Sequence, residues 1–190
     1  SEDLLTITWN LKEGVQWSDG SDFTAADVIF TYEYCTNEAT GCTSAEAFEG
    51  VTSVEAVDDL TVKITFDTPT PLPYNPFVGG GTPIIQMEQF KDCVGEAAQT
   101  CNDQNTMPHG TGPYTIVDFK VNDVVVYERN DLYHGDAPYF DRVVFKGGGD
   151  AASAARAVLE TGEADYAWNL QVEPQILAEM EEGGQGIVVA

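Results

Sequence analysis

The sequence predicts an α+β fold in which mixed and antiparallel sheets are flanked by helices. Runs of alternating apolar and polar residues, typical of strands, occur in both halves of the chain. Segments with capping residues and apolar positions at helical spacing lie between these runs. With 190 residues, 43% of them hydrophobic, the chain can bury a real core in one sizeable domain or two small ones.

The first half begins with a strand, a tight turn and a helix. Alternation in residues 5–11 places three apolar side chains on one strand face, those of Ile7, Trp9 and Leu11. Residues 17–20 (Trp-Ser-Asp-Gly) contain the Asp-Gly pair of a tight turn. Thr24 is the expected N-cap of a helix, and the apolar stripe of that helix consists of Val28, Ile29 and Tyr32.

A hairpin and a long loop follow this helix. Residues 51–57 and 60–66 are strand-like, and Asp58-Asp59 between them predicts a hairpin. Prolines are too dense in residues 69–76 for a helix or a central strand, so we expect an extended loop that continues through residues 77–81. Residues 84–91 predict a short helix, and the polar residues 102–109 a linker.

The strand pattern restarts in the second half. Residues 114–120 and 124–128 alternate as strands around a turn at Asn122-Asp123, and residues 140–146 predict a third strand. Asp150 is the expected cap of a helix over residues 151–161, which Gly162 ends. We expect a short strand at 164–168 and a last helix from Pro174 to Gly183-Gly184. Residues 187–190 are strand-like but lack a visible partner strand.

The charge balance limits the kinds of partner. Eight basic against 32 acidic residues give a formal net charge of −24. Phosphate backbones and anionic lipid surfaces would repel such a chain, so we expect no nucleic-acid partner. No apolar run approaches the roughly 18 residues of a membrane span, so we expect no direct membrane insertion either. Two explanations of the acidity stay open, namely solubility or salt tolerance and the steering of cationic ligands towards a cleft.

The four cysteines predict two local disulfides. Cys35 and Cys42 bracket one short polar loop, and Cys93 and Cys101 bracket another. Free thiols and a zinc site are the alternatives, although the chain has no Cys-x-x-Cys and only two histidines, His109 and His134. Disulfides imply an exported, oxidising setting. The missing Met and leader at the start indicate either a removed targeting segment or a piece of a longer protein.

Four motifs in order resemble those of one protein family. They are Trp-Ser-Asp-Gly at 17–20 with the following residues 23–28, Gly-Thr-Gly-Pro-Tyr at 110–114, Tyr-Glu-Arg-Asn-Asp-Leu-Tyr at 127–133, and Gly-Glu-Ala-Asp at 162–165. Together they cover nearly all of the chain. They are similar to signatures of the extracellular solute-binding proteins of family 5, the peptide- and nickel-binding type that serves ABC importers.

The resemblance implies a fold and a function. The fold would be a periplasmic-binding-protein type II-like lobe, with residues 1–108 as its small α+β subdomain and 109–190 as an incomplete main subdomain leading to the hinge. Family members are much longer, so the chain is expected to be an N-terminal-lobe fragment that lacks the second lobe. The whole protein would be an extracellular or periplasmic monomer, possibly lipid-anchored, that captures a peptide or similar small solute and delivers it to the ABC permease.

Candidate ligand contacts fall in two segments. The first is the irregular loop with Phe77, Gly79, Gly80, Gly81 and Thr82, where glycine lets a ligand approach the backbone. The second is Trp168-Asn169, which lies near the interlobe cleft in the resembling proteins; packing of Trp168 at a strand end is the alternative. We expect Gly110, Gly112 and Tyr114 to be hinge-adjacent. Trp17, Phe48 and Arg129 are expected to be architectural.

The sequence disfavours two other function classes, an acid hydrolase and an adhesion module. An acid hydrolase would need paired carboxylates, but pairs such as Asp58-Asp59 and Glu181-Glu182 are expected by chance in so acidic a chain. No Gly-x-Ser-x-Gly, His-Glu-x-x-His or phosphate-loop motif is present, so we expect no enzyme, no catalytic residue, no cofactor and no metal site. A disulfide-stabilised adhesion module would explain the exported chemistry but not the four ordered motifs.

Overall fold

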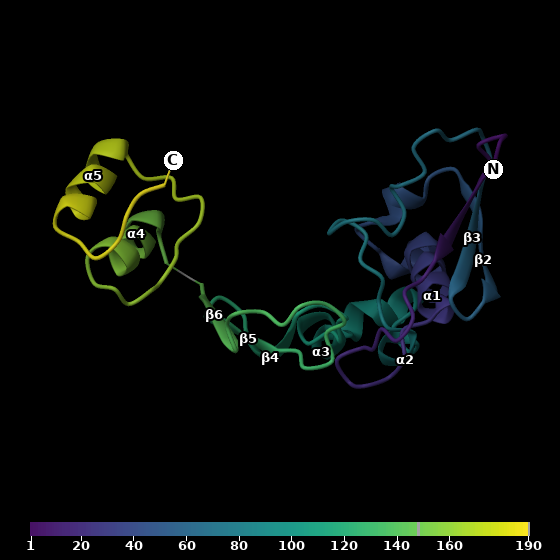
Figure 1. The fold of residues 1–190 in the computed structure, drawn as a ribbon, viewed down its shortest axis with the longest axis horizontal. Coiled ribbons are helices and arrows are strands. Elements are labelled where there is room, and N and C mark those ends of the chain that lie inside the picture. Colours follow the sequence, from purple (N-terminus) through teal and green to yellow (C-terminus); the bar gives the residue numbers. More distant parts are fainter. Residues whose placement is uncertain (148, 190) are drawn as a thin grey trace. The chain divides into compact units, whose positions relative to one another are not determined.

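The computed structural model describes residues 1–147 and 149–189, which form two compact units. Unit 1 comprises Ser1–Lys120 and Val124–Phe145. Unit 2 comprises residues 121–123 and the described residues from 146 onward. Figure 1 shows the strands and α1 to α3 of unit 1 and the helix pair of unit 2. The subdomain boundary expected after residue 108 stays a prediction.

The first sheet of unit 1 is antiparallel, with the order β1-β3-β2. Its strands are β1 (Thr6–Asn10), β2 (Val51–Asp58) and β3 (Thr61–Phe66), and β1 pairs with β3 so that Trp9 lies opposite Val62. The hairpin at residues 58–59 is confirmed, and the Asp58 carboxylate accepts a hydrogen bond from the Leu60 backbone at 2.9 Å. The β2–β3 register shifts at two points, between Val51 and Ser53 and between Ala56 and Asp58.

Helix α1 (Ala25–Thr36) covers this sheet (Figure 1). The core between them contains Ala25, Val28, Val54, Val62, Ile64 and Phe66. The predicted strand face and helix stripe are confirmed, because Ile7, Trp9, Leu11, Ile29 and Tyr32 all pack against this core. Full burial of one such aliphatic side chain stabilises the fold by about 1.5–3 kcal/mol.

A second core cluster surrounds a disulfide. Phe30 and Phe90 pack with Cys93 and Cys101, and both predicted pairings, Cys35–Cys42 and Cys93–Cys101, are confirmed. Four short helical turns belong to this part of unit 1, namely η1 (Glu38–Thr40), η2 (Ala45–Phe48), α2 (Met87–Phe90) and η3 (Gly95–Thr100). In the chain-entropy model each loop of this length gives about 2–3 kcal/mol of stabilisation.

Two predictions for this region were wrong in detail. The helix expected at 84–91 extends only over Met87–Phe90, because the Ile85 backbone donates to the Thr31 hydroxyl at 3.0 Å and Gln86 is extended. The polar stretch 102–109, expected to be a linker, begins with α3 (Asn102–Thr106). Its backbone bonds start at Cys101, whose disulfide fixes the beginning of this helix.

The second sheet has the order β4-β5-β6. Its strands are β4 (Tyr114–Lys120), β5 (Val124–Arg129) and β6 (Arg142–Lys146), and β4 pairs with β5 in antiparallel fashion. The predicted turn is confirmed by Asn122, whose φ of 59° lies in the left-handed region. Strand β6 begins two residues later than expected. The carbonyl of Phe140 instead accepts a hydrogen bond from the Tyr114 hydroxyl at 3.0 Å.

Unit 2 contains α4 (Ala151–Leu159) and α5 (Pro174–Glu182), with Ala155, Leu159 and Met180 buried between them. The predicted cap is confirmed, because the Asp150 side chain accepts from the Ser153 backbone at 2.8 Å. After α5 the backbone at Gly184 passes close to the end of α4. A Cβ at this position would lie 1.5 Å from the Leu159 carbonyl oxygen, so only glycine fits.

The strand expected at 164–168 is absent. The Ala164 backbone donates to the Ala157 carbonyl at 3.1 Å, so this segment folds back on α4 instead of pairing with a strand. The strand-like run 187–190 is also irregular over its described residues, since the Val188 backbone bonds the Glu181 carboxylate at 2.9 Å. Its last residue lies outside the described residues.

The buried carboxylate of Asp27 joins three segments of unit 1. Its Oδ2 accepts from the Trp17 indole N–H at 3.2 Å and from the Thr24 backbone at 3.0 Å, and its Oδ1 accepts from the Met87 backbone at 2.9 Å. The Thr24 contact completes a capping box at the start of α1. Asp27 is 5% exposed, so these donors replace water around the carboxylate.

We predict that Asp27→Asn destabilises the chain by about 2–4 kcal/mol, because an amide group cannot accept from all three donors. The measurement is the urea midpoint of unfolding. Glu33→Gln, at an exposed position on the same helix, is the matched control and should leave the midpoint nearly unchanged. Equal midpoints for the two variants would contradict the central role of Asp27.

Candidate functional site

The loop from Phe77 to Thr82 divides into packed ends and an exposed middle. The Phe77 ring contacts Phe48 edge-to-face with centroids 5.2 Å apart, and Phe48 is itself buried as expected. At the other end Thr82 is 6% exposed, and its hydroxyl donates to the Asn75 carbonyl at 3.1 Å. The three glycines between them are exposed, and a Cβ added to any of them would meet nothing within 4 Å.

The loop closes one side of an apolar hollow over β1. The hollow has a volume of about 140 Å³ and is lined by Trp9, Asn10, Leu11, Val28, Val62, Phe77, Val78 and Ile84. Sequence reasoning identified Phe77 and its loop as a candidate contact but missed the lining residues outside that loop. Their alternation along β1 predicts a buried face, whereas the hollow exists only once residues 77–84 fold against that face.

The indole N–H of Trp9 has no hydrogen-bond partner, and within the described residues it is the only buried side-chain nitrogen or oxygen of which this is true. Trp17 provides the contrast, because its N–H donates to Asp27. A buried donor without an acceptor destabilises a fold by about 1–3 kcal/mol, so such groups are rare in native proteins.

We predict that Trp9→Phe changes the free energy of unfolding by less than about 1 kcal/mol, whereas Trp17→Phe lowers it by about 1.5–3 kcal/mol. The two variants make the same chemical change, but only the second removes a hydrogen bond to a carboxylate. Urea denaturation of both proteins checks this. Equal losses would indicate that the Trp9 N–H has an acceptor.

The second candidate segment, Trp168-Asn169, belongs to unit 2. Trp168 is 77% exposed and lies in an irregular stretch between α4 and α5, so the expectation that it ends a strand was wrong. Asn169 has a left-handed φ of 52°, which is uncommon outside glycine. A large exposed indole with a free face can contact a ligand, but the ligand role of both residues stays a prediction.

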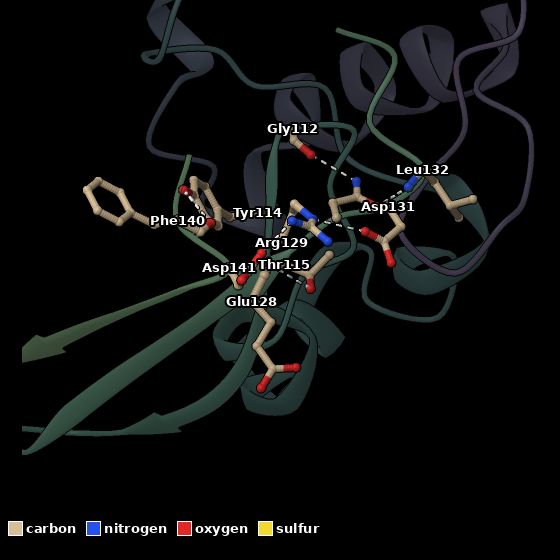
Figure 2. A network of polar contacts seen from close by, with 10 residues as sticks. Gly112, Tyr114, Thr115, Glu128, Arg129, Asp131, Leu132, Phe140 and Asp141 are labelled. Carbon is tan, nitrogen blue, oxygen red and sulfur yellow. Dashed lines mark hydrogen bonds and ion pairs between the residues drawn. The ribbon is translucent and has the colours of Figure 1, made fainter. Parts of the chain in front are cut away.

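The hinge-adjacent segment 109–114 is bound to other parts of unit 1 on both sides. Towards the first sheet, the Ser18 backbone donates to the Gly110 carbonyl at 2.9 Å, and the His109 backbone donates to the Gln89 side chain at 2.9 Å. Towards the second sheet, the Asn130 side chain donates to the Gly112 carbonyl at 2.8 Å (Figure 2). Tyr114 is the first residue of β4. Their hinge role stays a prediction.

Arg129 is paired locally, as expected of an architectural residue. Figure 2 shows its guanidinium group between Asp131 and Asp141, and the bond to Asp131 is 3.1 Å long. The hydrogen bond to Asp131 and the charge of Asp141 raise the pKa of Arg129 above its ordinary value. These groups, with Glu128 and Arg142, line a shallow polar hollow. Exposed ion pairs of this kind add little to stability, because water screens the two charges.

Asp19 carries the clearest shift in pKa. Burial raises the pKa of its carboxyl group, but donors from the Gln86 side chain at 2.8 Å and from the Ser21 backbone at 2.9 Å outweigh this effect. The Ser21 hydroxyl and the charge of His109 act in the same direction, and the resulting pKa is about 2. Gln86 is 2% exposed, so this contact fixes the turn before α1 against the segment before α2.

The lowered pKa predicts a pH dependence of stability. Because the pKa of Asp19 is lower in the folded chain than its ordinary value of 3.8, ionised Asp19 stabilises the fold above about pH 4, and this contribution is lost as the pH falls towards about 2. We expect Asp19→Asn to be destabilising at about pH 6 and much less so at about pH 2. Asp22→Asn is the control, and urea midpoints across this range are the measurement. A difference that stays constant with pH would contradict the prediction.

Among the residues that the structure describes, no group of three or more His, Cys, Asp and Glu side chains is placed to hold a metal ion. Within the same residues, no helix has both the length and the apolar character that a membrane crossing requires.

A family model and a curated relative both match this chain as a bacterial solute-binding protein. The family described as "Bacterial extracellular solute-binding proteins, family 5 Middle" matches residues 1–187. The chain is 32% identical over 174 residues to the glutathione-binding protein GsiB of Pectobacterium atrosepticum, an alignment that covers 91% of this chain and 32% of that protein. The chain therefore spans about a third of the length of this relative.

Solved structures show the same relationship. The ABC transporter substrate-binding protein CtaP of Listeria monocytogenes superposes with a TM-score of 0.79 at 30% identity, covering 97% of this chain and 36% of CtaP. The oligopeptide-binding protein AppA of Bacillus subtilis, solved with a nonapeptide, gives a TM-score of 0.75 at 27% identity, covering 84% of this chain and 31% of AppA.

Proposed function

Because the chain belongs to the family 5 bacterial extracellular solute-binding proteins, we propose that it forms part of the solute-binding component of an ABC importer. The predicted type II periplasmic-binding-protein lobe is confirmed by its likeness to CtaP and AppA. The whole protein captures a peptide or similar small solute outside the membrane and delivers it to the permease. The match over residues 1–187 carries this proposal.

A peptide is the ligand class that the relatives favour. One relative is named for binding glutathione, and one structural neighbour was solved with a nonapeptide. The net charge of −24 favours cationic peptides among them, since like charges repel anionic ones. Specificity within this class depends on residues of the whole protein beyond this chain.

The proposed mechanism is the closure of two lobes around the ligand. The loop around Gly79, Gly80 and Gly81 provides backbone close to the ligand, and Trp168 provides an aromatic surface with Asn169 beside it. Gly110 and Gly112 lie next to the hinge, where the hydrogen bonds described above fix the segment on both sides. The closed form is what the permease recognises.

The remaining parts of the proposal follow from the family. The protein binds and releases its solute unchanged, without catalysis and without a cofactor, and it works as a monomer. It is exported to the periplasm or the cell exterior, and this location is compatible with the two disulfides of unit 1. Attachment to the membrane through a lipid is part of this proposal for the whole protein.

A binding experiment with the complete protein tests the proposal. We expect a pool of peptides, including glutathione, to stabilise the complete protein by about 2.7 kcal/mol when the ligand is present at about 100 times its Kd, and to stabilise the 190-residue chain far less. Thermal-shift measurements on both proteins check this. Failure of every peptide and small-solute pool to stabilise the complete protein would overturn the proposal.

Single substitutions in the complete protein test the contact residues. Trp168→Ala should weaken binding of the identified peptide about tenfold or more, as is typical for a buried aromatic contact. Tyr166→Ala, at a comparably exposed aromatic of the same segment, is the matched control and should have little effect. Isothermal titration calorimetry gives both affinities, and equal values for the two variants would remove Trp168 from the site.

A further inference from the structure

Unit 2 is held together by a small core. It has about 50 residues, and the cluster between α4 and α5 buries the side chains of Ala155, Leu159 and Met180. Each of the two helices has nine residues, whereas an isolated helix needs about 12–15 residues to be even marginally stable in water. All four cysteines lie in unit 1, so no disulfide supports unit 2. The fold of unit 2 is therefore only marginally stable.

Unit 2 is also strongly acidic. Its sequence contains nine acidic and two basic residues. One of the two basic residues, Arg156, lies in the last turn of α4 and pairs with Glu160 at 2.9 Å. Like charges repel one another, and folding brings them closer together than they are in an open chain. This repulsion acts against the small core.

The end of α5 concentrates the repulsion. The last turn of this helix carries Glu179, Glu181 and Glu182 and has no basic residue. Within the residues that the structure describes, none of these three carboxylates forms an ion pair. The C-terminal end of a helix already has a partial negative charge, so carboxylates are unfavourable there at low ionic strength. Salt weakens such repulsion, because the Debye length falls from about 30 Å at 0.01 M to about 3 Å at 1 M.

The segment with Trp168 depends on the same core. Leu170 and Val172, which follow Trp168-Asn169 closely, pack against the cluster between α4 and α5. Earlier in the segment, the Ala164 backbone donates to the Ala157 carbonyl of α4 at 3.1 Å. When the two helices separate, the segment loses the packing that positions it.

We propose that unit 2 is a salt-dependent folding element that positions the Trp168 segment. At molar ionic strength, screening of the carboxylates lets α4 and α5 pack; at low ionic strength the unit opens while unit 1 stays folded. Unit 1 resists this change because it has two disulfides and two core clusters of its own. The ligand role of Trp168 rests on the proposed function, whereas the folding of unit 2 does not.

Hydrogen exchange of the 190-residue chain, followed by mass spectrometry without any ligand, tests the proposal. We expect the backbone amides of α4 and α5 to exchange at least about 100 times more slowly in about 2 M KCl than in about 0.05 M KCl. The amides of α1 in unit 1 should change by less than about tenfold. Exchange in α4 and α5 that is equally slow at both salt concentrations, or equally fast at both, would overturn the proposal.

Neutralising the end of α5 should lower the salt requirement. In the double variant Glu179→Gln/Glu182→Gln, we expect the KCl concentration at half-maximal protection of α4 and α5 to fall at least about twofold. The matched control Glu46→Gln/Glu49→Gln makes the same change in net charge at exposed positions of unit 1 and should leave that concentration unchanged. Equal concentrations in the two variants would overturn the assignment of the effect to α5.

Two other solutes separate screening from its alternatives. Sucrose favours compact states without screening charge, so about 1 M sucrose should protect α4 and α5 much less than KCl does. About 1 mM Mg²⁺ added to about 0.05 M KCl should also have little effect, because it changes the ionic strength only slightly. Equal protection by sucrose would indicate general stabilisation, and protection by millimolar Mg²⁺ would indicate a bound cation. Either result would overturn the proposal.

Discussion

The carboxylate of Asp27 is the constraint on which the rest of unit 1 depends. It accepts hydrogen bonds from Trp17, from the backbone before α1, and from the Met87 backbone at the start of α2. The Met87 donor lies 60 residues from Asp27 in the sequence. A buried carboxylate requires such donors. Unit 1 is therefore stable only when the turn at residues 17–20, α1 and the start of α2 pack against one another. The helix cap is therefore also a tertiary contact.

From Asp27 a series of polar contacts extends to the segment that connects the two sheets. Gln86, which precedes Met87, donates to Asp19 in the turn, and Ser18 of the same turn donates through its backbone to Gly110. Gln89 of α2 accepts from the backbone of His109. Because each contact fixes backbone, the position of residues 109–112 follows from the packing of α1 and α2. Gly110 and Gly112 lie in this fixed segment, and their place next to a hinge stays a prediction.

Sequence reasoning predicted the elements whose signals are local. The cap at Thr24, the hairpin at 58–59, both disulfide pairings and the helix from Pro174 depend on neighbouring residues, and the structure confirms them. Two of the failures depend on contacts outside the segment that carries the pattern. Residues 164–168 carry a strand pattern, but the segment bonds back to α4. The hollow at Trp9 depends on the loop at Phe77 and Val78, far away in the sequence, and no pattern in either segment indicates it.

The two candidate contact regions differ in what they offer a ligand. The hollow at Trp9 is apolar and small, so it would discriminate between occupants mainly by their size. Trp168 is 77% exposed on an irregular segment, and covering a side chain of roughly 200 Å² to that extent stabilises a complex by about 4 kcal/mol before ordering costs. Such a residue contributes affinity with little selectivity. Under the proposed function both properties would be useful, because peptides share a backbone and differ in their side chains.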